Sequence, residues 1–241
     1  MLYGLIGYPL VHSFSQAYFK KKFAELNIDA DYELFPIPDI SEFPQILTSH
    51  PDLGGLNVTI PYKETVIPFL DELDDKAREI GAVNCITIRN GKTKGYNTDA
   101  EALRKTLFPL LKPHHTHALV LGTGGASKAV AYVLKSLNIP YKLVSRNHKE
   151  GSFTYTDITK EIINEYKLII NTTPMGMTPN MGSYAPIPYN KLGMQHLLYD
   201  LVYNPEETRF LSLGRAHGAA IKNGIEMLQL QAEAGWEIWN S

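Results

Sequence analysis

Ala118-Leu-Val-Leu-Gly122-Thr-Gly124-Gly125-Ala126-Ser127 is a short apolar run that turns into glycines, and it decides the fold of the second half of the chain. The apolar run predicts a buried strand, and the helical pattern that follows through Leu137 predicts a helix that the glycines open. Glycines permit unusual dihedrals and close approach, and a helix N-terminus presents unpaired N–H groups to a phosphate. The segment predicts either a pyrophosphate-binding turn or a tight turn without a ligand, and Ser127 replaces the third glycine of the dinucleotide-binding motif.

The next predicted strand ends in Val144-Ser145-Arg146-Asn147, where no carboxylate stands. An acid at this position would bind the ribose hydroxyls of NAD, whereas a guanidinium favours a 2′-phosphate. The turn and the strand end together therefore predict NADP in preference to NAD, although Arg146 alone would be interpreted as a solvated surface residue. The missing acid also disfavours a methyltransferase that uses S-adenosylmethionine.

Strands and helices alternate on both sides of this segment. Downstream, the predicted strands 118–121, 141–145, 168–171 and 197–202 are separated by helices, which predicts a doubly wound, Rossmann-like parallel sheet.

The first half predicts a second α/β unit. Strands 2–7, 32–37 and 54–61 alternate with helices at 16–26, around 43–47 and at 63–73, and a hairpin follows with strands 83–88 and 92–96.

A helix at about 100–111 and then Pro113 with His114, His115 and His117 mark a boundary between the halves. No cysteine or carboxylate stands at ligand spacing from these histidines, so we expect a solvated linker and no metal site. The last predicted helix, 225–239, is apolar on more than one side. We expect it to pack back on the first half.

The composition excludes several classes of protein. The chain has 241 residues, 44% hydrophobic and 20% charged, with a formal net charge of −2, which gives no basic face for nucleic acid or an anionic membrane. Cys85 is the single cysteine, so no intrachain disulfide is expected. No apolar run approaches the ~20 residues that span a bilayer, and the N-terminus is predicted to be a strand and no signal peptide. We expect a cytoplasmic protein.

Polar residues gather at the predicted strand ends of the first half. Ser13 and Ser15 flank one turn, Lys63 follows a strand end, Asn84 begins the hairpin and Asp99 follows it. Strand ends and hairpin mouths are common positions for site residues. Helix capping remains an equally good interpretation of the two serines and an additional one for Asp99.

In order along the chain, these runs resemble the motifs of the shikimate dehydrogenase family, nearly from end to end. The matching motifs are Gly7-x-Pro9-x-x-His12-Ser13-x-Ser15, Asn57-Val-Thr-Ile-Pro-Tyr-Lys63, Gly81-Ala-Val-Asn84, Asn97-Thr-Asp99, Gly122-x-Gly-Gly-Ala-Ser127, Asn171-Thr-Thr-Pro-Met-Gly176, Tyr199-Asp200-x-x-Tyr203-x-Pro205, and Gly224 to Gln231.

The resemblance implies a metal-free, two-domain enzyme that reduces 3-dehydroshikimate to shikimate with NADPH in aromatic amino-acid biosynthesis. It implies a discontinuous substrate domain of residues 1–100 plus 219–241 and an NADP domain of residues 101–218. We expect a monomer or homodimer whose partners are small molecules.

The resemblance also implies residue roles. Ser13 and Ser15, with Tyr203 nearby, should bind the substrate carboxylate. Thr59, Asn84 and Gln231 should contact ring hydroxyls, and Lys63 and Asp99 should flank the reacting oxygen. The implied cofactor-binding residues are Gly122, Gly124, Gly125, Ala126, Ser127, Ser145, Arg146, Asn147, Thr172, Met175 and Gly224.

The chemistry of the reaction agrees with such a pair. Hydride transfer to a ketone builds alkoxide character, which an ammonium group stabilises and can protonate. Asp99 would hold Lys63 in place and accept from a substrate hydroxyl. Which of the two carries the transferred proton stays open.

Some positions depart from the family pattern. Gln16 replaces a usual proline, Ala100 and Ala102 replace common glycines, and Glu150 stands where a second arginine is expected near the 2′-phosphate. The alternatives are a relative that acts on quinate or an aminated shikimate, and a noncatalytic ligand-binding relative, which Lys63 and Asp99 disfavour. His12 is predicted to be a structural hydrogen-bonding residue.

Overall fold

The computed structural model describes residues 1–10 and 13–241, so His12 lies outside the described residues. It divides into two compact units. Unit 1 is Met1–Thr98 with Ala232–Ser241, and unit 2 is Asp99–Gln231. The division therefore falls two residues before the boundary expected at 100, and the chain returns to unit 1 at Ala232, later than the expected 219.

Unit 1 is built on a mixed six-stranded sheet in the order β2-β1-β3-β5-β6-β4. β1 pairs in parallel with β2 and β3, and the hairpin of β5 and β6 adds antiparallel strands to that core. Its turn residues Asn90 and Gly91 both have positive φ, as the Asn-Gly signal predicts. The strands are β1 (Leu2–Gly7), β2 (Asp31–Pro36), β3 (Leu53–Val58), β4 (Glu72–Leu73), β5 (Cys85–Arg89) and β6 (Lys92–Tyr96).

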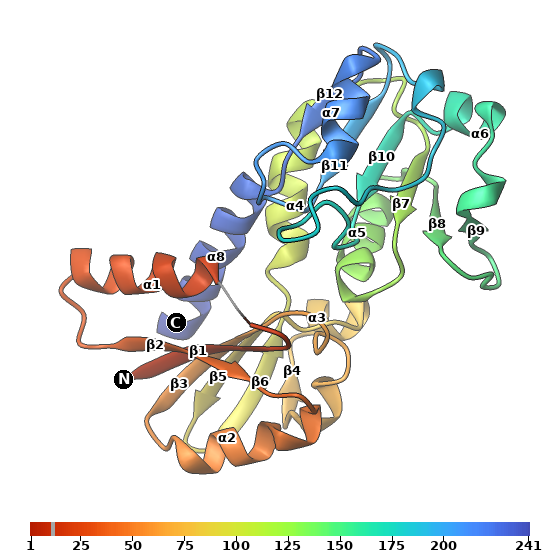
Figure 1. Ribbon diagram of the computed structural model, residues 1–241. Coiled ribbons are helices and arrows are strands. Elements are labelled where there is room, and N and C mark those ends of the chain that lie inside the picture. Colours follow the sequence, from red (N-terminus) through yellow and green to blue (C-terminus); the bar gives the residue numbers. More distant parts are fainter. Residues whose placement is uncertain (11–12) are drawn as a thin grey trace. The chain divides into compact units, whose positions relative to one another are not determined.

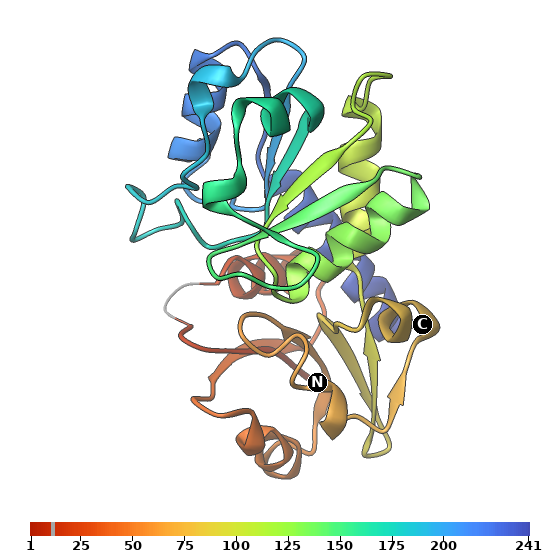
Figure 2. The ribbon, with the colours of Figure 1, turned by 90° about the vertical axis from the view of Figure 1, so that its right-hand side faces the viewer.

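Helices cover both faces of this sheet (Figure 1 and Figure 2). On one face, α1 (Phe14–Glu25) and the end of α8 (Ile225–Asn240) form an aromatic core with Tyr3, Phe19 and Tyr32. On the other face, α2 (Phe43–Ser49) packs over a mainly aliphatic core. The shorter α3 (Asp75–Ile80) precedes the hairpin.

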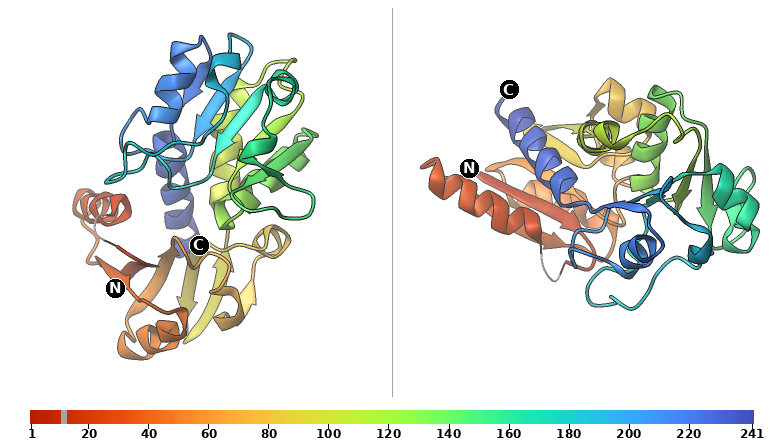
Figure 3. Two further views of the ribbon diagram at one scale, coloured as in Figure 1. Left: turned by 45° about the vertical axis from the view of Figure 1, so that its right-hand side comes forward. Right: turned by 90° about the horizontal axis from the view of Figure 1, so that it is seen from above.

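The end of α8 is fastened to unit 1 by Trp239, as we expected of the last helix. The Trp239 ring stacks on Tyr3 with centroids 4.7 Å apart, and its Nε1 donates to the carbonyl of Ile86 at 3.0 Å. The ring fits against Gly55, where an added Cβ would lie 2.3 Å from Nε1. Arg89 donates to the carbonyl oxygens of Trp239 and Ser241, which are C-terminal groups that a cation stabilises. Figure 3 shows α1 and the end of α8 on the same side of the sheet.

The prediction of a helix at 63–73 was wrong. Residues 60–66 form turns, a short 3-10 helix spans Ile67–Phe69, and β4 follows. Pro68 in that 3-10 helix has no N–H, so a longer α-helix would lose a hydrogen bond and clash with the preceding turn.

Unit 2 contains the predicted doubly wound parallel sheet, in the order β12-β11-β10-β7-β8-β9. The chain order reverses between β7 and β10, so the carboxyl ends of these two strands form the switch point at which such sheets bind ligands. The strands are β7 (Ala118–Leu121), β8 (Tyr141–Ser145), β9 (Phe153–Thr154), β10 (Leu168–Asn171), β11 (Leu197–Asp200) and β12 (Ala220–Lys222).

The helices of unit 2 are α4 (Asp99–Leu107), α5 (Gly125–Ser136), α6 (Lys160–Glu165), α7 (Arg209–Ala216) and the first part of α8, up to Gln231. Side chains of α6 and α7 join those of the strands in one core cluster. α4 and α5 lie side by side (Figure 1). Among the described residues, no helix is long and apolar enough to cross a membrane.

The expectation that His115 lies in a solvated linker was wrong. Its side chain is 6% exposed, and its Nδ1 accepts from the backbone N–H of Lys112 at 3.0 Å. The ring also bonds to the backbone of Gln195, just before β11, and burial lowers its pKa to about 4. His115 thus joins the segment before β7 to the segment before β11.

Candidate active site

The glycine turn of unit 2 has the geometry that a phosphate needs. Gly122 has φ of +113°, and a Cβ there would lie 2.6 Å from the Thr172 hydroxyl, so a side chain is excluded. Gly124 caps α5 without a side-chain bond, and the first turn of α5 contains no acidic residue. A Cβ on Gly124 would meet no described atom within 4 Å. The N-terminal N–H groups of α5 are therefore set in a favourable position for an anion.

Ser127 has a structural position inside this turn. Its side chain is 2% exposed, and its hydroxyl donates to the carbonyl of Gly124 at 2.7 Å. The residue that replaces the third glycine therefore closes the first turn of α5 and lies beneath the glycines.

Two cations lie beyond the glycine turn. Arg146 is exposed at the end of β8, near enough to Tyr155 that its charge opposes the rise in the pKa of Tyr155 caused by burial. Lys149 reaches back to the turn, where its Nζ donates to the Thr123 hydroxyl at 3.1 Å. Sequence reasoning missed Lys149. A basic residue so soon after Arg146 was the available signal.

The loop after β10 contains Thr172 and Met175. The Thr172 hydroxyl donates to the carbonyl of Leu121 at 2.7 Å, which ties the loop to the end of β7. Met175 is half-buried and packs against the core of unit 2. This loop lines a cavity of ≈ 240 Å³ whose walls are Pro174, Met175, Met177, Thr178, Pro179, Asn180 and Ser183.

The start of α8 is held against the residues that follow β11. Gly224 donates to the carbonyl of Val202 at 3.1 Å, and a Cβ on Gly224 would lie 2.2 Å from the carbonyl oxygen of Leu201. Only glycine fits here. Tyr203 is half-buried in the loop after β11, and Gln231, 8% exposed, donates to the carbonyl of Leu228 on α8.

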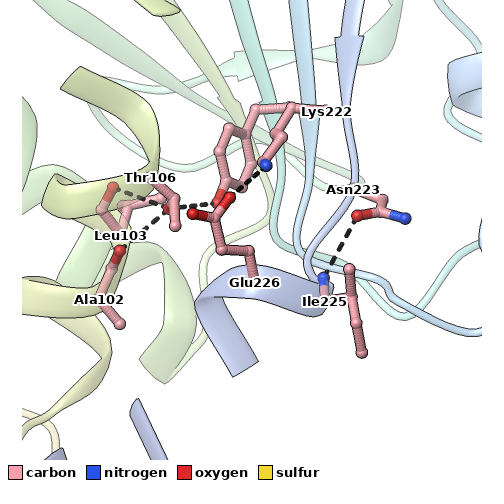
Figure 4. Close-up of polar contacts among 8 residues, drawn as sticks. Ala102, Leu103, Thr106, Lys222, Asn223, Ile225 and Glu226 are labelled. Carbon is pink, nitrogen blue, oxygen red and sulfur yellow. Dashed lines mark hydrogen bonds and ion pairs between the residues drawn. The ribbon is translucent and has the colours of Figure 1, made fainter. Parts of the chain in front are cut away.

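Figure 4 shows polar contacts around Thr106 of α4 and the start of α8. The Thr106 hydroxyl lies 2.6 Å from the hydroxyl of Tyr199, a residue of β11. Asn223 accepts from the N–H of Ile225, and Lys222 pairs with Glu226 one turn later. The Thr106 contact fixes α4 to β11, and the other two contacts hold the start of α8 to the segment of β12 that precedes it.

Unit 1 holds the serines. Ser13 caps α1 by accepting from the N–H of Gln16 at 3.3 Å, so the predicted capping role is present. Ser15 is 9% exposed and hydrogen-bonds to the hydroxyl of Tyr32, which in turn donates to Asn57 Oδ1 at 2.7 Å. Sequence reasoning did not identify Tyr32, because a tyrosine in a strand is usually a packing residue.

Lys63 and Thr59 follow β3. The Thr59 N–H donates to the carbonyl of Ile6 at 3.0 Å, which extends the pairing with β1 beyond the strand. Lys63 is half-buried in the turn that follows, and its carbonyl accepts from the N–H of Val83 at 2.7 Å. The backbone at Lys63 is therefore tied to the residue before Asn84.

Asn84 fixes the other end of this arrangement. It is 1% exposed, accepts from the N–H of Thr98 at 2.7 Å and donates to the Thr98 hydroxyl at 2.9 Å. Asp99 follows directly as the first residue of α4, with 6% of its side chain exposed. Val83 and Asn84, which precede the β5–β6 hairpin, therefore fix the backbone at Lys63 and at Thr98, the residue before Asp99.

Among the described residues, no group of three or more His, Cys, Asp or Glu side chains could hold a metal ion. Unit 1 presents hydroxyls, an amide and one ammonium at strand ends. Unit 2 presents an open helix N-terminus and two cations. The set suits a small polar acid on one unit and a phosphorylated dinucleotide on the other.

Comparison with known proteins gives a consistent result. Residues 5–86 match the family model for the shikimate dehydrogenase substrate binding domain. A shikimate dehydrogenase (NADP(+)) of Methanosphaera stadtmanae is 34% identical over 258 residues, with 99% of this chain and 91% of the relative covered.

Solved structures agree with the sequence match. The structure of shikimate dehydrogenase 1 from Peptoclostridium difficile superposes on this chain with a TM-score of 0.86 at 36% sequence identity. The match covers 99% of this chain and 91% of the other. Shikimate 5-dehydrogenase from Thermus thermophilus, solved in complex with NADP(H) and shikimate, has a TM-score of 0.86 at 28% identity, covering 99% and 93%. Because the sequence and structural matches extend over nearly the whole length of this chain and of each relative, this chain belongs to the shikimate dehydrogenase family.

Proposed function

We propose that this chain catalyses the reversible, NADP-dependent reduction of 3-dehydroshikimate to shikimate. The observation that carries the proposal is the frame around Asn84, which ties the backbone at Lys63 and the residue before Asp99 to one hairpin. A relative that had lost catalysis would have no need to keep an ammonium and a buried carboxylate on such a frame. The near full-length match to relatives named for this NADP-dependent reaction supports the same conclusion.

We propose that the two units bind different ligands. Unit 1, which contains the matched substrate binding domain, binds the acid, and unit 2 binds NADP. On unit 2, Gly124, Gly125 and Ala126 present N–H groups to the pyrophosphate, and Arg146 with Asn147 and Ser145 faces the 2′-phosphate. NADPH supplies the hydride when it is bound. Thr172, Met175 and Gly224 complete the predicted cofactor contacts.

On unit 1, Ser13 and Ser15 are proposed to bind the substrate carboxylate. The Ser13 oxygen accepts a backbone N–H in the helix cap, and a hydroxyl that accepts in this way still has a proton to donate. The start of α1 adds the positive end of a helix dipole, so the carboxylate is stabilised twice. Tyr203 is assigned to the same carboxylate, and Thr59, Asn84 and Gln231 to the ring hydroxyls.

Lys63 is proposed to stabilise the developing alkoxide at the carbonyl oxygen and to exchange a proton with it. Asp99 accepts from the neighbouring substrate hydroxyl and orients Lys63.

The decisive experiment follows the absorbance of the reduced cofactor, NADPH or NADH, at 340 nm with shikimate or quinate, each with NADP⁺ and with NAD⁺. The proposal predicts turnover with shikimate and NADP⁺ as the best pair. Faster turnover with quinate would assign the chain to that alternative substrate, and absence of turnover with either acid would refute the proposed function. We also propose a cytoplasmic location, which agrees with a single cysteine that is buried and unpaired.

A further inference from the structure

Asp200, the last residue of β11, is a carboxylate that is 0% exposed. Its Oδ1 accepts from Asn171 Nδ2 at 2.9 Å and from the Val202 N–H at 3.0 Å, and its Oδ2 accepts from the Thr208 hydroxyl at 2.6 Å. These three donors are uncharged. Burial raises the pKa of Asp200 to about 6 in spite of them, so the charged form is costly for the fold. A feature that costs stability needs another reason to be present.

The first reason is the orientation of Asn171. An ionised carboxylate only accepts hydrogen bonds, so Asn171 must turn its NH₂ group toward Asp200 and its carbonyl oxygen away. That oxygen then accepts from the Thr173 N–H at 3.1 Å and from the Thr173 hydroxyl at 2.6 Å. The Thr173 hydroxyl in turn accepts from the N–H of Met175 at 3.3 Å. One relay therefore runs from Asp200 to the backbone of Met175.

The second reason is the position of Thr208. Its hydroxyl donates to Asp200 and accepts from the N–H of Leu211, where it caps α7. Its carbon atoms occupy the space beside Gly176, where an added Cβ would lie 3.1 Å from Thr208 Cβ. Gly176 has φ of +87° and donates its N–H to the Ser183 hydroxyl at 3.0 Å. A second relay therefore fixes the residue that follows Met175.

Both relays end in the loop that lines the ≈ 240 Å³ cavity, of which Met175 and Ser183 are walls. We propose that Asp200 is a positioning residue that holds Met175 and Gly176 in the one conformation that presents this wall to the nicotinamide ring during hydride transfer. The role of the ring rests on the proposed function, whereas the two relays do not.

The test compares two threonines that each make a buried 2.6 Å hydroxyl contact with neighbouring residues of β11. Thr208 bonds to Asp200, and Thr106 bonds to Tyr199 but to neither relay. Thr208→Val and Thr106→Val remove one hydroxyl each without changing the side-chain shape. Thr173→Val interrupts the first relay at a half-buried position, so it tests the same idea if Thr208→Val fails to fold.

The first readout is the ¹³C-methyl NMR spectrum of the methionines, with and without NADP⁺. The chain has six methionines, so Met175 can be followed against Met1, Met194 and Met227, which lie off the loop. Thr208→Val and Thr173→Val should shift the Met175 signal and alter its response to NADP⁺, whereas Thr106→Val should leave both unchanged. An unchanged Met175 signal in the two relay variants would overturn the proposal, whether or not the protein turns over shikimate.

The second readout separates geometry from binding. In the relay variants kcat should fall about tenfold and the deuterium isotope effect on hydride transfer should rise, because a misplaced ring slows the chemical step. The dissociation constant of NADP⁺ should change less than twofold, since the adenine half is held elsewhere. Equal kinetic effects in Thr106→Val and Thr208→Val would reduce Asp200 to a purely structural role. If the wild-type protein does not oxidise shikimate, the proposed function fails and the methyl spectra alone decide the relays.

Discussion

Replacing His115 with glutamine should remove much of the acid sensitivity of unit 2. The buried ring accepts from the Lys112 N–H and bonds to the backbone of Gln195, and glutamine can accept and donate at similar positions. Glutamine does not titrate. The variant therefore keeps the link between the segments before β7 and β11 and loses only the proton-binding group.

The magnitude follows from the two pKa values. Histidine in the unfolded chain binds a proton near pH 6.5, whereas in the fold burial lowers the pKa of His115 to about 4. Between these values the unfolded state holds more protons, so stability is present above the window and is lost as the pH falls through it. From pH 7.5 to pH 5.0 the loss from this one group is about 2 kcal/mol.

Other groups add to this dependence. Burial also lowers the pKa of His196, which acts in the same direction. Asp200 acts in the opposite direction, because its folded pKa is raised to about 6 and the fold binds its proton first as the pH falls. The comparison of wild type with His115→Gln at the same two pH values cancels both contributions.

The assay is urea unfolding at pH 7.5 and 5.0, followed by far-UV circular dichroism for both units and by tryptophan fluorescence for unit 1, which holds both tryptophans. Wild type should lose about 2 kcal/mol more than His115→Gln between the two pH values. The control is His117→Gln on the same loop, where the side chain is 36% exposed, and it should behave as wild type. An identical pH dependence in wild type and His115→Gln would refute the reasoning.

Three further outcomes are expected. Lys63→Ala should lower kcat by a factor of about 10² to 10⁴ with little change in the circular dichroism spectrum, and near-normal turnover would contradict its catalytic role. Arg146→Ala should raise the KM for NADP⁺ far more than that for NAD⁺, and steady-state kinetics showing equal effects would remove the 2′-phosphate assignment. Gly55→Ala should destabilise unit 1 by about 1–3 kcal/mol in urea unfolding, because the new methyl group overlaps the Trp239 ring. Gly193→Ala, whose Cβ would meet no described atom within 4 Å, is its control and should leave the unfolding midpoint unchanged.

Three strands of unit 2 were predictable from the sequence with their bounds, since the runs 118–121, 141–145 and 168–171 coincide with β7, β8 and β10. β7 and β10 are fully buried, because an apolar run bounded by polar or turn residues has one stable use in an α/β unit. The short helices α6 and α7 were not predicted. Helices of six and eight residues complete too few turns for a 3.6-residue pattern to be recognised.

The candidate site divides in the same way. The polar residues at strand ends and the Asn-Gly hairpin were predictable from the sequence. That hairpin sets the register that places Cys85 opposite Tyr96, and this register brings Asn84 next to Thr98. The hydrogen bond from Lys149 to Thr123 and the contacts of Asp200 were not predictable from the sequence. They depend on side chains from separate loops that meet only after the sheet has formed.

The return of α8 to unit 1 has a consequence for the order in which the protein folds. Ala232 and Trp239 belong to the same core as Tyr3 and Phe19, so β1 and α1 lack part of their core until residues 232–239 have been made. Unit 2 is continuous in sequence from Asp99 to Gln231, so its core needs no residue that is made after Gln231. During synthesis the N-terminal unit therefore completes its core after the C-terminal one, and its apolar sheet face stays open to chaperones in the interval.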